Sequence, residues 1–370
     1  LVILSLDGGG LRGLLPIQVL KNLEEISGKK TVDCFDLIAG TSTGALIACG
    51  LVTPNKTGGA KFTLNDIENT YLQRGKHIFE ERSAFSKFFH TWVKGIFFPE
   101  FNPKGLENEL EQLFNKEGQI RLSDGLKPLL ITAFDLNANR PEFFKTRYVH
   151  QIESDAAKVP VYDRNRVVNE ASNALFYDMC RATSAAPTYL PAYKFSFDNR
   201  SLLCVDGGVF MNNPSMAALV EMWKYFEYYR PGEKMEEENI YVLSIGTGKS
   251  KRRSVDNEKT AVYYGGKKNW VKPITDIMMI GPNAAADYQT KEALTFNRFD
   301  ENGKIISTTV NYLRINIDLL HEYTDMTDSS DHTRNYLLAE FQKQYFDNRD
   351  EQGKAQADYL KDFLIKAGVI

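Results

Sequence analysis

Largely apolar runs that end in glycine-rich turns dominate the beginning of the chain. Residues 1–6 (LVILSL) lead into Asp7-Gly-Gly-Gly, which predicts a buried strand that enters a tight loop. Apolar residues then recur at helical spacing over 14–26. A second apolar run, 35–39, precedes another glycine-rich turn and a segment, 45–51, that is typical of a buried helix. Two strand–loop–helix units so early in the chain favour a parallel sheet covered by helices.

The later pattern predicts further elements of the same kind within one domain. Strands are expected at 128–134, 143–144, 202–205 and 240–245, and helices within 53–75, over 174–183 and within 333–369. Two stretches lack such patterns: 150–170 is polar and insertion-like, and 249–272 is basic and loop-like. Because no repeat, low-complexity tract or linker divides the chain, we expect one domain over 1–370. Its motif-bearing core spans about 1–250, and a C-terminal helical portion spans about 310–370.

Composition and charge exclude several classes of protein. Of the 370 residues, 43% are apolar and 25% are charged, which is usual for a soluble globular chain. The net charge of -3 gives no basic field for a nucleic-acid polymer. The longest uncharged stretch, 37–52, is shorter than the roughly 20 residues of a membrane-spanning helix, and the first residues do not resemble a signal peptide. Four scattered cysteines without metal-like spacing indicate buried thiols in a reducing compartment, so we expect a cytoplasmic protein.

The first glycine-rich loop, Asp7-Gly8-Gly9-Gly10-Leu11-Arg12-Gly13, follows a predicted strand and opens a helix. It matches the dinucleotide fingerprint GxGxxG, with Asp33 about twenty residues further on. In that fold the acid lies at the carboxyl end of the second strand, whereas Asp33 precedes the strand at 35–39, so the match is weak. Backbone N–H groups of glycines at a helix N-terminus, with Arg12 nearby, stabilise an anion. That anion is either a phosphate or the oxyanion of an acyl-transfer intermediate.

The second loop contains Gly40-x-Ser42-x-Gly44 between a predicted strand and a predicted helix. This arrangement is typical of a nucleophilic serine on a sharp turn, where the helix dipole favours developing negative charge. The same residues are equally typical of a helix start that Ser42 or Thr41 caps. The motif alone leaves both interpretations open.

The third loop, 245–250 (IGTGKS), contains Gly-Lys-Ser after a predicted strand. A phosphate-binding P-loop needs glycine where Leu243 stands, and the residues before the loop have a strand pattern. A turn that closes a parallel strand therefore explains this loop better.

A nucleophilic serine needs a base, and no histidine is an obvious one. In α/β-hydrolases the triad follows the order Ser, acid, His, which Ser42, Asp206 and either of the last two histidines would satisfy. That fold places several strands ahead of the nucleophile, whereas 41 residues precede Ser42 here. All five histidines lie in aromatic, charged or polar surroundings typical of surface positions: His77, His90, His150, His321 and His332.

Asp206 has a different setting, because it follows the apolar run 202–205 and precedes Gly207 and Gly208. A carboxylate at the end of a strand, with glycines that clear room around it, is well placed to act as a base. An Asx turn is the alternative interpretation, since Asp-Gly-Gly is common in such turns. A free aspartate has a pKa near ~3.9, too low for a base at neutral pH. We therefore expect burial to raise the pKa of Asp206.

Four motifs in this order resemble the patatin-like phospholipases: DGGGLRG (7–13), GTSTG (40–44), ATSAAPTYLPAY (182–193) and VDGGVFMNNP (205–214). The resemblance covers residues 1 to about 250 and implies a three-layer α/β fold, with a central, mainly parallel sheet flanked by helices. It also implies a Ser–Asp dyad in place of a triad. Ser42 matches the family nucleophile and Asp206 the general base, and the oxyanion-hole segment is matched by Gly8, Gly9, Gly10 and Arg12. The motif near 182–191 receives no catalytic role. The acidic motif ends Asp-Gly-Gly where Asp-Gly-Ala is common in the family, and both end in a small residue.

The resemblance implies hydrolysis of lipid acyl esters, of phospholipase A or lysophospholipase type, through an acyl-serine and without a metal or cofactor. The implied partners are a phospholipid or other acyl-ester lipid and, transiently, a membrane surface. Two alternatives use the same dyad. One is a phospholipase effector that a small molecule activates, as some bacterial members are in cyclic-nucleotide antiphage defence, and the other is an acyltransferase.

Two further segments have open interpretations. The aromatic stretch 85–101 is either a lid or membrane-contacting surface, or a core helix with its following turn. The basic stretch 249–253, with Lys267, Lys268 and Lys272, either meets anionic headgroups or is a solvated loop.

Overall fold

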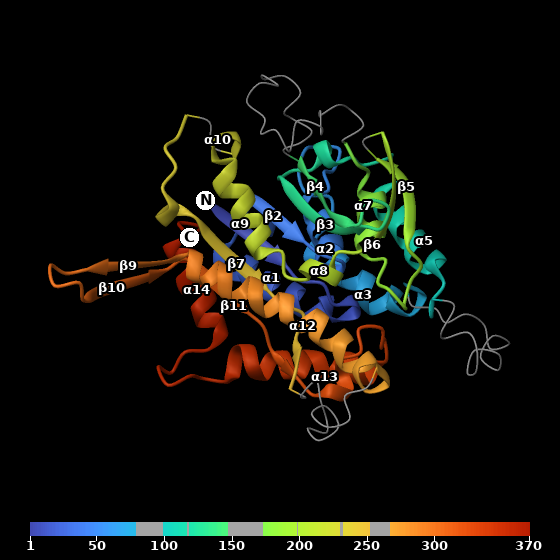
Figure 1. Ribbon diagram of the computed structural model, residues 1–370. Helices are drawn as coiled ribbons and strands as arrows, with labels where there is room; N and C mark the ends of the chain where they lie inside the picture. The colour runs from blue at the N-terminus through green and yellow to red at the C-terminus, as the bar shows by residue number, and fades with distance from the viewer. Residues whose placement is uncertain (79–98, 117, 147–172, 198, 230–231, 252–266) are drawn as a thin grey trace.

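A computed structural model describes residues 1–78, 99–116, 118–146, 173–197, 199–229, 232–251 and 267–370 (Figure 1). The insertion-like stretch 150–170 lies outside the described residues, as does the aromatic stretch 85–101 except for its last three positions. Residues 252–266 of the basic stretch also lie outside them. The interpretations of these segments therefore stay predictions.

An eight-stranded sheet forms the centre of the fold, in the order β11-β7-β1-β2-β3-β6-β5 with β4 beside β3. β1, β2, β3, β7 and β11 are parallel to one another, whereas β4, β5 and β6 pair antiparallel. The strands are β1 (Val2–Leu6), β2 (Leu37–Gly40), β3 (Leu129–Asp135), β4 (Arg140–Lys145), β5 (Tyr193–Phe197), β6 (Arg200–Asp206), β7 (Tyr241–Ile245) and β11 (Tyr312–Ile315). This mainly parallel sheet confirms the predicted α/β class.

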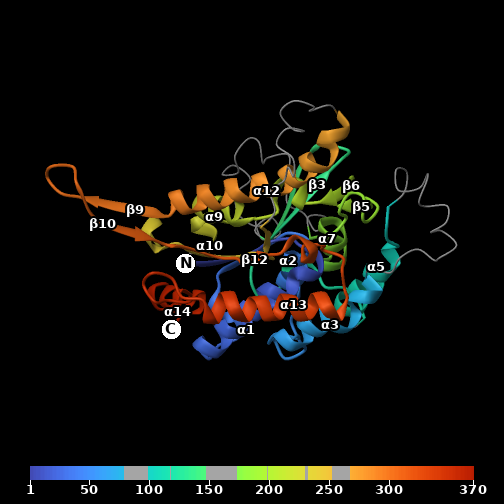
Figure 2. The same cartoon turned by 90° about the horizontal axis from the view of Figure 1, so that it is seen from below.

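Helices cover both faces of the sheet, which gives three layers (Figure 2). One layer contains α1 (Leu14–Ser27), α2 (Thr43–Val52), α3 (Leu64–Ile78), α5 (Pro103–Phe114), α7 (Phe176–Thr183), α13 (Asp331–Phe341) and α14 (Gln356–Lys366). The other contains α9 (Ser215–Lys224) and α12 (Lys267–Ala293). Shorter elements are η1 (Gly10–Gly13), η2 (Thr31–Cys34), η4 (Leu122–Asp124), α8 (Gly208–Met211), α10 (Phe226–Tyr229), η8 (Glu237–Asn239), β8 (Lys249–Ser250), β12 (Asp318–Leu319), η9 (His321–Tyr323) and the π-helix η10 (Gln342–Asp347). No described helix is both long and apolar enough to cross a bilayer.

The inner strands are apolar at successive positions because both of their faces are covered. In β1, Leu4 packs against the layer of α1 and α2, and its neighbour Ile3 packs against the layer of α9. Every residue of β1 and β2 is buried. Successive side chains of a strand point to opposite faces, so a strand covered on both faces reads as a continuous apolar run. This is why the runs at 1–6 and 35–39 were readable as strands.

The pattern after residue 250 predicts less of the structure. The stretch 249–272 was expected to be a loop throughout, but α12 begins at Lys267. Its 27 residues include two prolines and a glycine and mix polar with apolar residues, which obscures the helical period. The predicted C-terminal helical portion contains α13 and α14, but it begins with the strand β11. Ahead of β11, the hairpin of β9 (Thr295–Phe299) and β10 (Ile305–Val310) projects from the body of the molecule (Figure 1).

Candidate active site

Ser42 lies on a sharp turn between β2 and α2. Its backbone has φ 51° and ψ −122°, a region that non-glycine residues rarely occupy and that is typical of strained functional turns. A Cβ at Gly40 would lie 2.6 Å from backbone atoms of Gly44, and a Cβ at Gly44 would lie 2.2 Å from the carbonyl oxygen of Leu6. Both positions therefore require glycine because backbones approach each other closely there.

The side chains at this turn do not cap the following helix. Ser42 occupies the N-cap position of α2 but makes no side-chain capping hydrogen bond. The hydroxyl of Thr41 instead donates to the carbonyl oxygen of Met211 at 2.8 Å and lies 2.7 Å from the hydroxyl of Thr132. Of the two interpretations of the motif, the helix cap is therefore wrong in this structure, and the Ser42 hydroxyl remains available for chemistry.

The carboxyl ends of β2 and β6 meet along one edge of β3. β4 pairs with β3 over its residues 130–135, so β2 and β6 share the opposite edge. β2 ends with Gly40 opposite Ile131, and β6 arrives from the other direction and ends with Asp206 opposite Ala133. Ser42 follows Gly40 by two residues, as Ala133 follows Ile131. The register therefore brings Ser42 and Asp206 together from positions 164 residues apart in the chain.

Asp206 is buried, with 6% of its surface exposed. Burial raises the pKa of its carboxyl to about 6, although hydrogen bonds from the backbone of Gly208 and from the side chain of Ser42 lower it in part. The Gly208 N–H donates to Oδ1 at 2.7 Å, which closes the Asx turn that the sequence allowed. The Asx turn and the contact with Ser42 are therefore both present. The turn orients the carboxylate, and Ser42 contacts it.

The first glycine-rich loop lies beside Ser42. A Cβ at Gly8 would be 3.1 Å from the Cβ of Ser42. The N–H of Gly8 already donates to the carbonyl oxygen of Asn212 at 3.2 Å, and the Gly8 carbonyl accepts from Thr247 at 2.7 Å. Within the described residues, the N–H groups of Gly9 and Gly10 have no hydrogen-bond acceptor. Of the three glycines that the sequence analysis named, only Gly8 therefore has its N–H engaged by an acceptor within the described part of the chain.

A buried ion pair fixes the start of this loop. Arg314 of β11 donates from Nη1 to Oδ1 of Asp7 at 2.9 Å and from Nη2 to Oδ2, and it also donates to Ser244 at 2.7 Å. Burial raises the pKa of Asp7, although the charge of Arg314 opposes this effect. Burial alone would lower the pKa of Arg314, but the charge of Asp7 outweighs it and the pKa is raised. Such a bidentate pair fixes geometry as well as charge, and nothing in the sequence pattern pointed to Arg314.

Arg12 braces the loop from its other end. Its guanidinium donates to the carbonyl oxygens of Gly9 and Gly248, each at 3.4 Å. Burial lowers the pKa of Arg12 to about 10, so the side chain stays charged at neutral pH. The hydrogen bonds of this predicted oxyanion-hole residue therefore go to carbonyl groups that shape the loop. The third glycine-rich loop, which contains Thr247 and Gly248, is thus a support for the first one.

The segment around 182–191, to which the sequence analysis gave no catalytic role, contacts both Ser42 and Asp206. The hydroxyl of Thr183 accepts a hydrogen bond from the N–H of Ser42 at 2.9 Å, and the carbonyl of Ala185 accepts one from the N–H of Asp206 at 3.0 Å. Thr183 is fully buried. The motif ATSAAP was the available signal, but only the fold shows which of its residues face the site.

The two histidines whose side chains are described have partners elsewhere. Nδ1 of His321 lies 3.5 Å from the hydroxyl of Ser250, and Nε2 of His332 lies 2.8 Å from the hydroxyl of Tyr323. Both residues are exposed. The side chains of His77, His90 and His150 lie outside the described part of the chain.

Comparison with known proteins places this chain among patatin-like proteins. A family model described as patatin-like phospholipase matches residues 4–219. Patatin-like protein 1 of Oryza sativa subsp. indica is 31% identical over 359 residues, which cover 91% of this chain and 78% of that protein. Patatin-like protein 4 of Arabidopsis thaliana is 31% identical over 348 residues (89% and 79%), and Patatin-T5 of Solanum tuberosum is 27% identical over 356 residues (91% and 81%).

Among solved structures, VipD from Legionella pneumophila covers 92% of this chain and 67% of its own, with a TM-score of 0.38 and 12% identity. That likeness is too remote to bear on the site. The match of the family model to more than half of the chain, and the relatives at 31% identity over most of it, show that the chain belongs to the patatin-like phospholipase family.

Proposed function

We propose that the protein hydrolyses lipid acyl esters with Ser42 as the nucleophile and Asp206 as the general base. Membership of the patatin-like phospholipase family supports lipid acyl hydrolase activity broadly. The observation that carries the assignment of residues is the meeting of β2 and β6 along β3, where a strained serine contacts a buried carboxylate. This geometry supports a nucleophile and a base formed by Ser42 and Asp206.

In the first step, Oγ of Ser42 attacks the ester carbonyl carbon and its proton passes to Asp206. The carbonyl oxygen becomes an oxyanion that accepts hydrogen bonds from the N–H groups of Gly9 and Gly10. The intermediate collapses, the C–O bond to the alcohol breaks, and Asp206 returns the proton to the leaving oxygen. Water then attacks the acyl-serine while Asp206 takes one of its protons. The intermediate collapses, the bond between the acyl carbon and Oγ of Ser42 breaks, and Asp206 returns the proton to Oγ, which releases the carboxylic acid and restores both residues.

The raised pKa makes this carboxylate a better base than a free aspartate. With a pKa of about 6, Asp206 is ionised at neutral pH and still has appreciable proton affinity. The remaining activation barrier is lowered by the N–H groups that stabilise the oxyanion. Arg12 and the Asp7–Arg314 pair hold the loop that carries these groups in position. Phospholipase A or lysophospholipase specificity and transient contact with a membrane surface belong to this proposal.

Labelling with a fluorophosphonate tests the assignment, together with release of fatty acid from phospholipid vesicles. We expect Ser42→Ala to abolish labelling and Asp206→Asn to slow labelling and hydrolysis by roughly 10²- to 10⁴-fold. The matched controls are His321→Ala and His332→Ala, which should keep both activities. Near-normal turnover in the folded Asp206→Asn protein would refute the assignment of the base, as would loss of labelling in a folded histidine variant.

The gated effector and the acyltransferase remain alternatives that use the same dyad. A lipase that stays silent on vesicles until a cyclic nucleotide is added would identify the first. A shift of acyl release from water to added glycerol would identify the second. Neither result would change the expected effects of Ser42→Ala and Asp206→Asn.

A further inference from the structure

Residues 324–328, between η9 and α13, form a loop that packs directly on the first glycine-rich loop; we call it the Met326 loop. The carbonyl oxygen of Met326 accepts the N–H of Leu11 at 2.8 Å. Gly10, the residue before Leu11, has φ 57°, and a Cβ there would lie 2.2 Å from the same carbonyl oxygen. A side chain at position 10 would therefore push the two loops apart, and glycine lets their backbones touch.

The bond from Leu11 to Met326 fixes the backbone next to the two N–H groups that the proposed function uses. Gly8 is held on their other side by the hydrogen bonds described above. Between these two fixed points, the N–H groups of Gly9 and Gly10 have no acceptor among the described residues. Donors that are oriented before the reaction stabilise an oxyanion without a cost of reorganisation. The contact with Met326 provides such an orientation.

Asp325 sets the direction of the Met326 carbonyl. Its Oδ1 accepts the N–H of Thr327 at 2.9 Å and the hydroxyl of Thr327 at 2.7 Å, so this Asx turn spans Met326. Asp325 also acts on Arg12, because burial lowers the pKa of the guanidinium and the charge of Asp325 opposes this effect. Arg12 in turn donates to the carbonyl oxygen of Gly9 at 3.4 Å. The side chain of Asp325 thus bears on both ends of the segment that carries the two N–H groups.

Both ends of the Met326 loop are anchored in the body of the molecule. Before the loop, Leu319 pairs with Ser250 where β12 meets β8, and its carbonyl oxygen accepts the N–H of Lys251 at 3.0 Å. After the loop, the hydroxyl of Ser330 accepts the N–H of Thr333 at 3.2 Å, and Thr333 is buried. α13 then packs against α1. The position of the Met326 carbonyl is therefore set by the fold on both sides.

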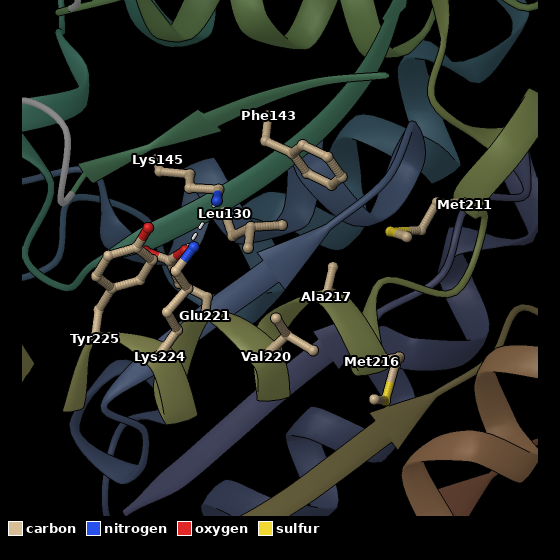
Figure 3. A pocket seen from close by; sticks show the side chains of 10 residues that line it. All are labelled: Leu130, Phe143, Lys145, Met211, Met216, Ala217, Val220, Glu221, Lys224 and Tyr225. Atoms are coloured by element: carbon tan, nitrogen blue, oxygen red, sulfur yellow. Dashed lines mark hydrogen bonds and ion pairs between the residues drawn. The ribbon is translucent and has the colours of Figure 1, made fainter. Parts of the chain in front are cut away.

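The α8 side of the candidate site packs less tightly. Met211, whose carbonyl accepts the Thr41 hydroxyl at 2.8 Å, also lines a cavity of about 320 Å³ between α9 and the strands β3 and β4 (Figure 3). Space for small shifts therefore exists on this side, whereas Gly10 has none toward Met326. Of these two contacts, the one with the Met326 loop constrains its neighbour more.

We propose that the Met326 loop positions the N–H groups of Gly9 and Gly10 for the oxyanion, and that Asp325 is the positioning residue within it. Asp325 acts through the carbonyl of Met326. The inference rests on the proposed function, which assigns the oxyanion to these two N–H groups. Loss of one oxyanion donor lowers kcat by about 10²- to 10³-fold. Misplacement of donors that are still present should cost less, about tenfold.

Kinetics with a soluble acyl ester test this role. Asp325→Ala removes the Asx turn and should lower kcat about tenfold with little change in KM. An acyl trifluoromethyl ketone, to which the Ser42 hydroxyl adds to form an oxyanion, should also bind about tenfold more weakly. Asp325→Asn keeps an acceptor for the Thr327 N–H and should recover most of kcat. The matched control is Asp300→Ala, which removes the same kind of turn from the hairpin of β9 and β10 and should change neither constant.

Hydrogen–deuterium exchange separates this inference from the proposed function. The carbonyl of Met326 protects the Leu11 amide, so this amide should exchange severalfold faster in Asp325→Ala and at the normal rate in Asp300→Ala. The measurement is made in the Ser42→Ala background and needs no hydrolysis. Unchanged exchange at Leu11 would overturn the inference, as would faster exchange with unchanged kcat.

Two other results have distinct meanings. A defect in Asp325→Asn as large as that in Asp325→Ala would overturn the action through the Met326 carbonyl. Full activity of the Ser42→Ala protein would instead overturn the proposed function.

Discussion

Ser42 and Asp206 stand at the carboxyl ends of two strands that approach each other along the same edge of β3. β2 and β6 run in opposite directions there, with Gly40 opposite Ile131 and Asp206 opposite Ala133. The antiparallel direction of β6 is therefore part of the site. A parallel strand in the same place would present its amino end to Ser42, and the Asp-Gly-Gly turn would lie elsewhere.

Hydrolysis should be lost as the pH falls through about 6. The base must be ionised, and burial raises the pKa of Asp206 to about 6 from an ordinary value of 3.8. The pH dependence of kcat/KM on a soluble acyl ester measures the midpoint. His332→Ala should leave the profile unchanged. A midpoint that moves in this variant would point to a histidine base instead.

Asp206→Asn should stabilise the protein at neutral and higher pH while it inactivates it. The pKa of Asp206 is raised in the folded state. The contribution of this carboxyl group to the free energy of unfolding is therefore fully present below pH 3.8 and is lost as the pH rises through about 6. The gap between these values corresponds to about 3 kcal/mol. Urea unfolding should show an advantage of up to this size for Asp206→Asn at pH 8. The advantage should shrink toward pH 4.5 and be missing in the exposed control Asp33→Asn. A constant difference at all pH values would contradict the assignment.

Breaking the Asp7–Arg314 pair should damage both folding and catalysis. Arg314→Met leaves the Asp7 carboxylate buried without its partner, which costs about 3–5 kcal/mol in comparable cases. The double variant Asp7→Asn/Arg314→Met removes both charges and should recover much of the free energy of unfolding. Chemical denaturation of the two single variants and the double variant measures this coupling. If the effects of the single variants simply add in the double variant, the pair does not act as a unit.

Thr183 should affect the rate of acylation more than substrate binding. Thr183→Val removes the acceptor of the Ser42 N–H and leaves a buried donor unpaired, at a cost of about 1–3 kcal/mol. We expect kcat to fall about tenfold or more with little change in KM. Thr183→Ser keeps the hydroxyl and should restore most of the rate. Equal defects in the valine and serine variants would mean that shape matters at this position and the hydrogen bond does not.

Two glycine-to-alanine substitutions should have opposite effects, one damaging the site and the other raising the stability of the protein. At Gly44 an added Cβ would lie 2.2 Å from the carbonyl oxygen of Leu6, so Gly44→Ala must shift the backbone and should abolish labelling of Ser42. At Gly281 in α12 an added Cβ has no atom within 4 Å, and alanine should stabilise the helix by up to about 1 kcal/mol. Thermal unfolding and fluorophosphonate labelling of the two variants measure both effects. Labelling that survives in Gly44→Ala would refute the need for close packing at this turn.

The pattern of the chain was most informative where the sheet is buried on both faces. The runs at 1–6, 35–39, 128–134 and 240–245 correspond to β1, β2, β3 and β7, because a fully covered strand must be apolar throughout. The pattern did not predict β11, because its four residues include the charged Arg314. α12 was not predicted either, because its two prolines, its glycine and its mixture of polar and apolar residues obscure the helical period. Both elements are specified by what they pack against.

The residues proposed for chemistry could be named from local motifs, because a serine with a glycine two residues away on each side, or an aspartate followed by two glycines, is a short-range signal. Ser42, Asp206 and the first glycine-rich loop were found in this way. The residues that hold them in place could not, since Arg314, Thr183 and Thr247 come from distant segments and carry ordinary side chains. Tertiary structure decided which amides of Gly8–Gly10 are engaged and what Arg12 contacts. It also set the pKa of Asp206, because burial and neighbouring donors are properties of the packed fold and not of the local chain.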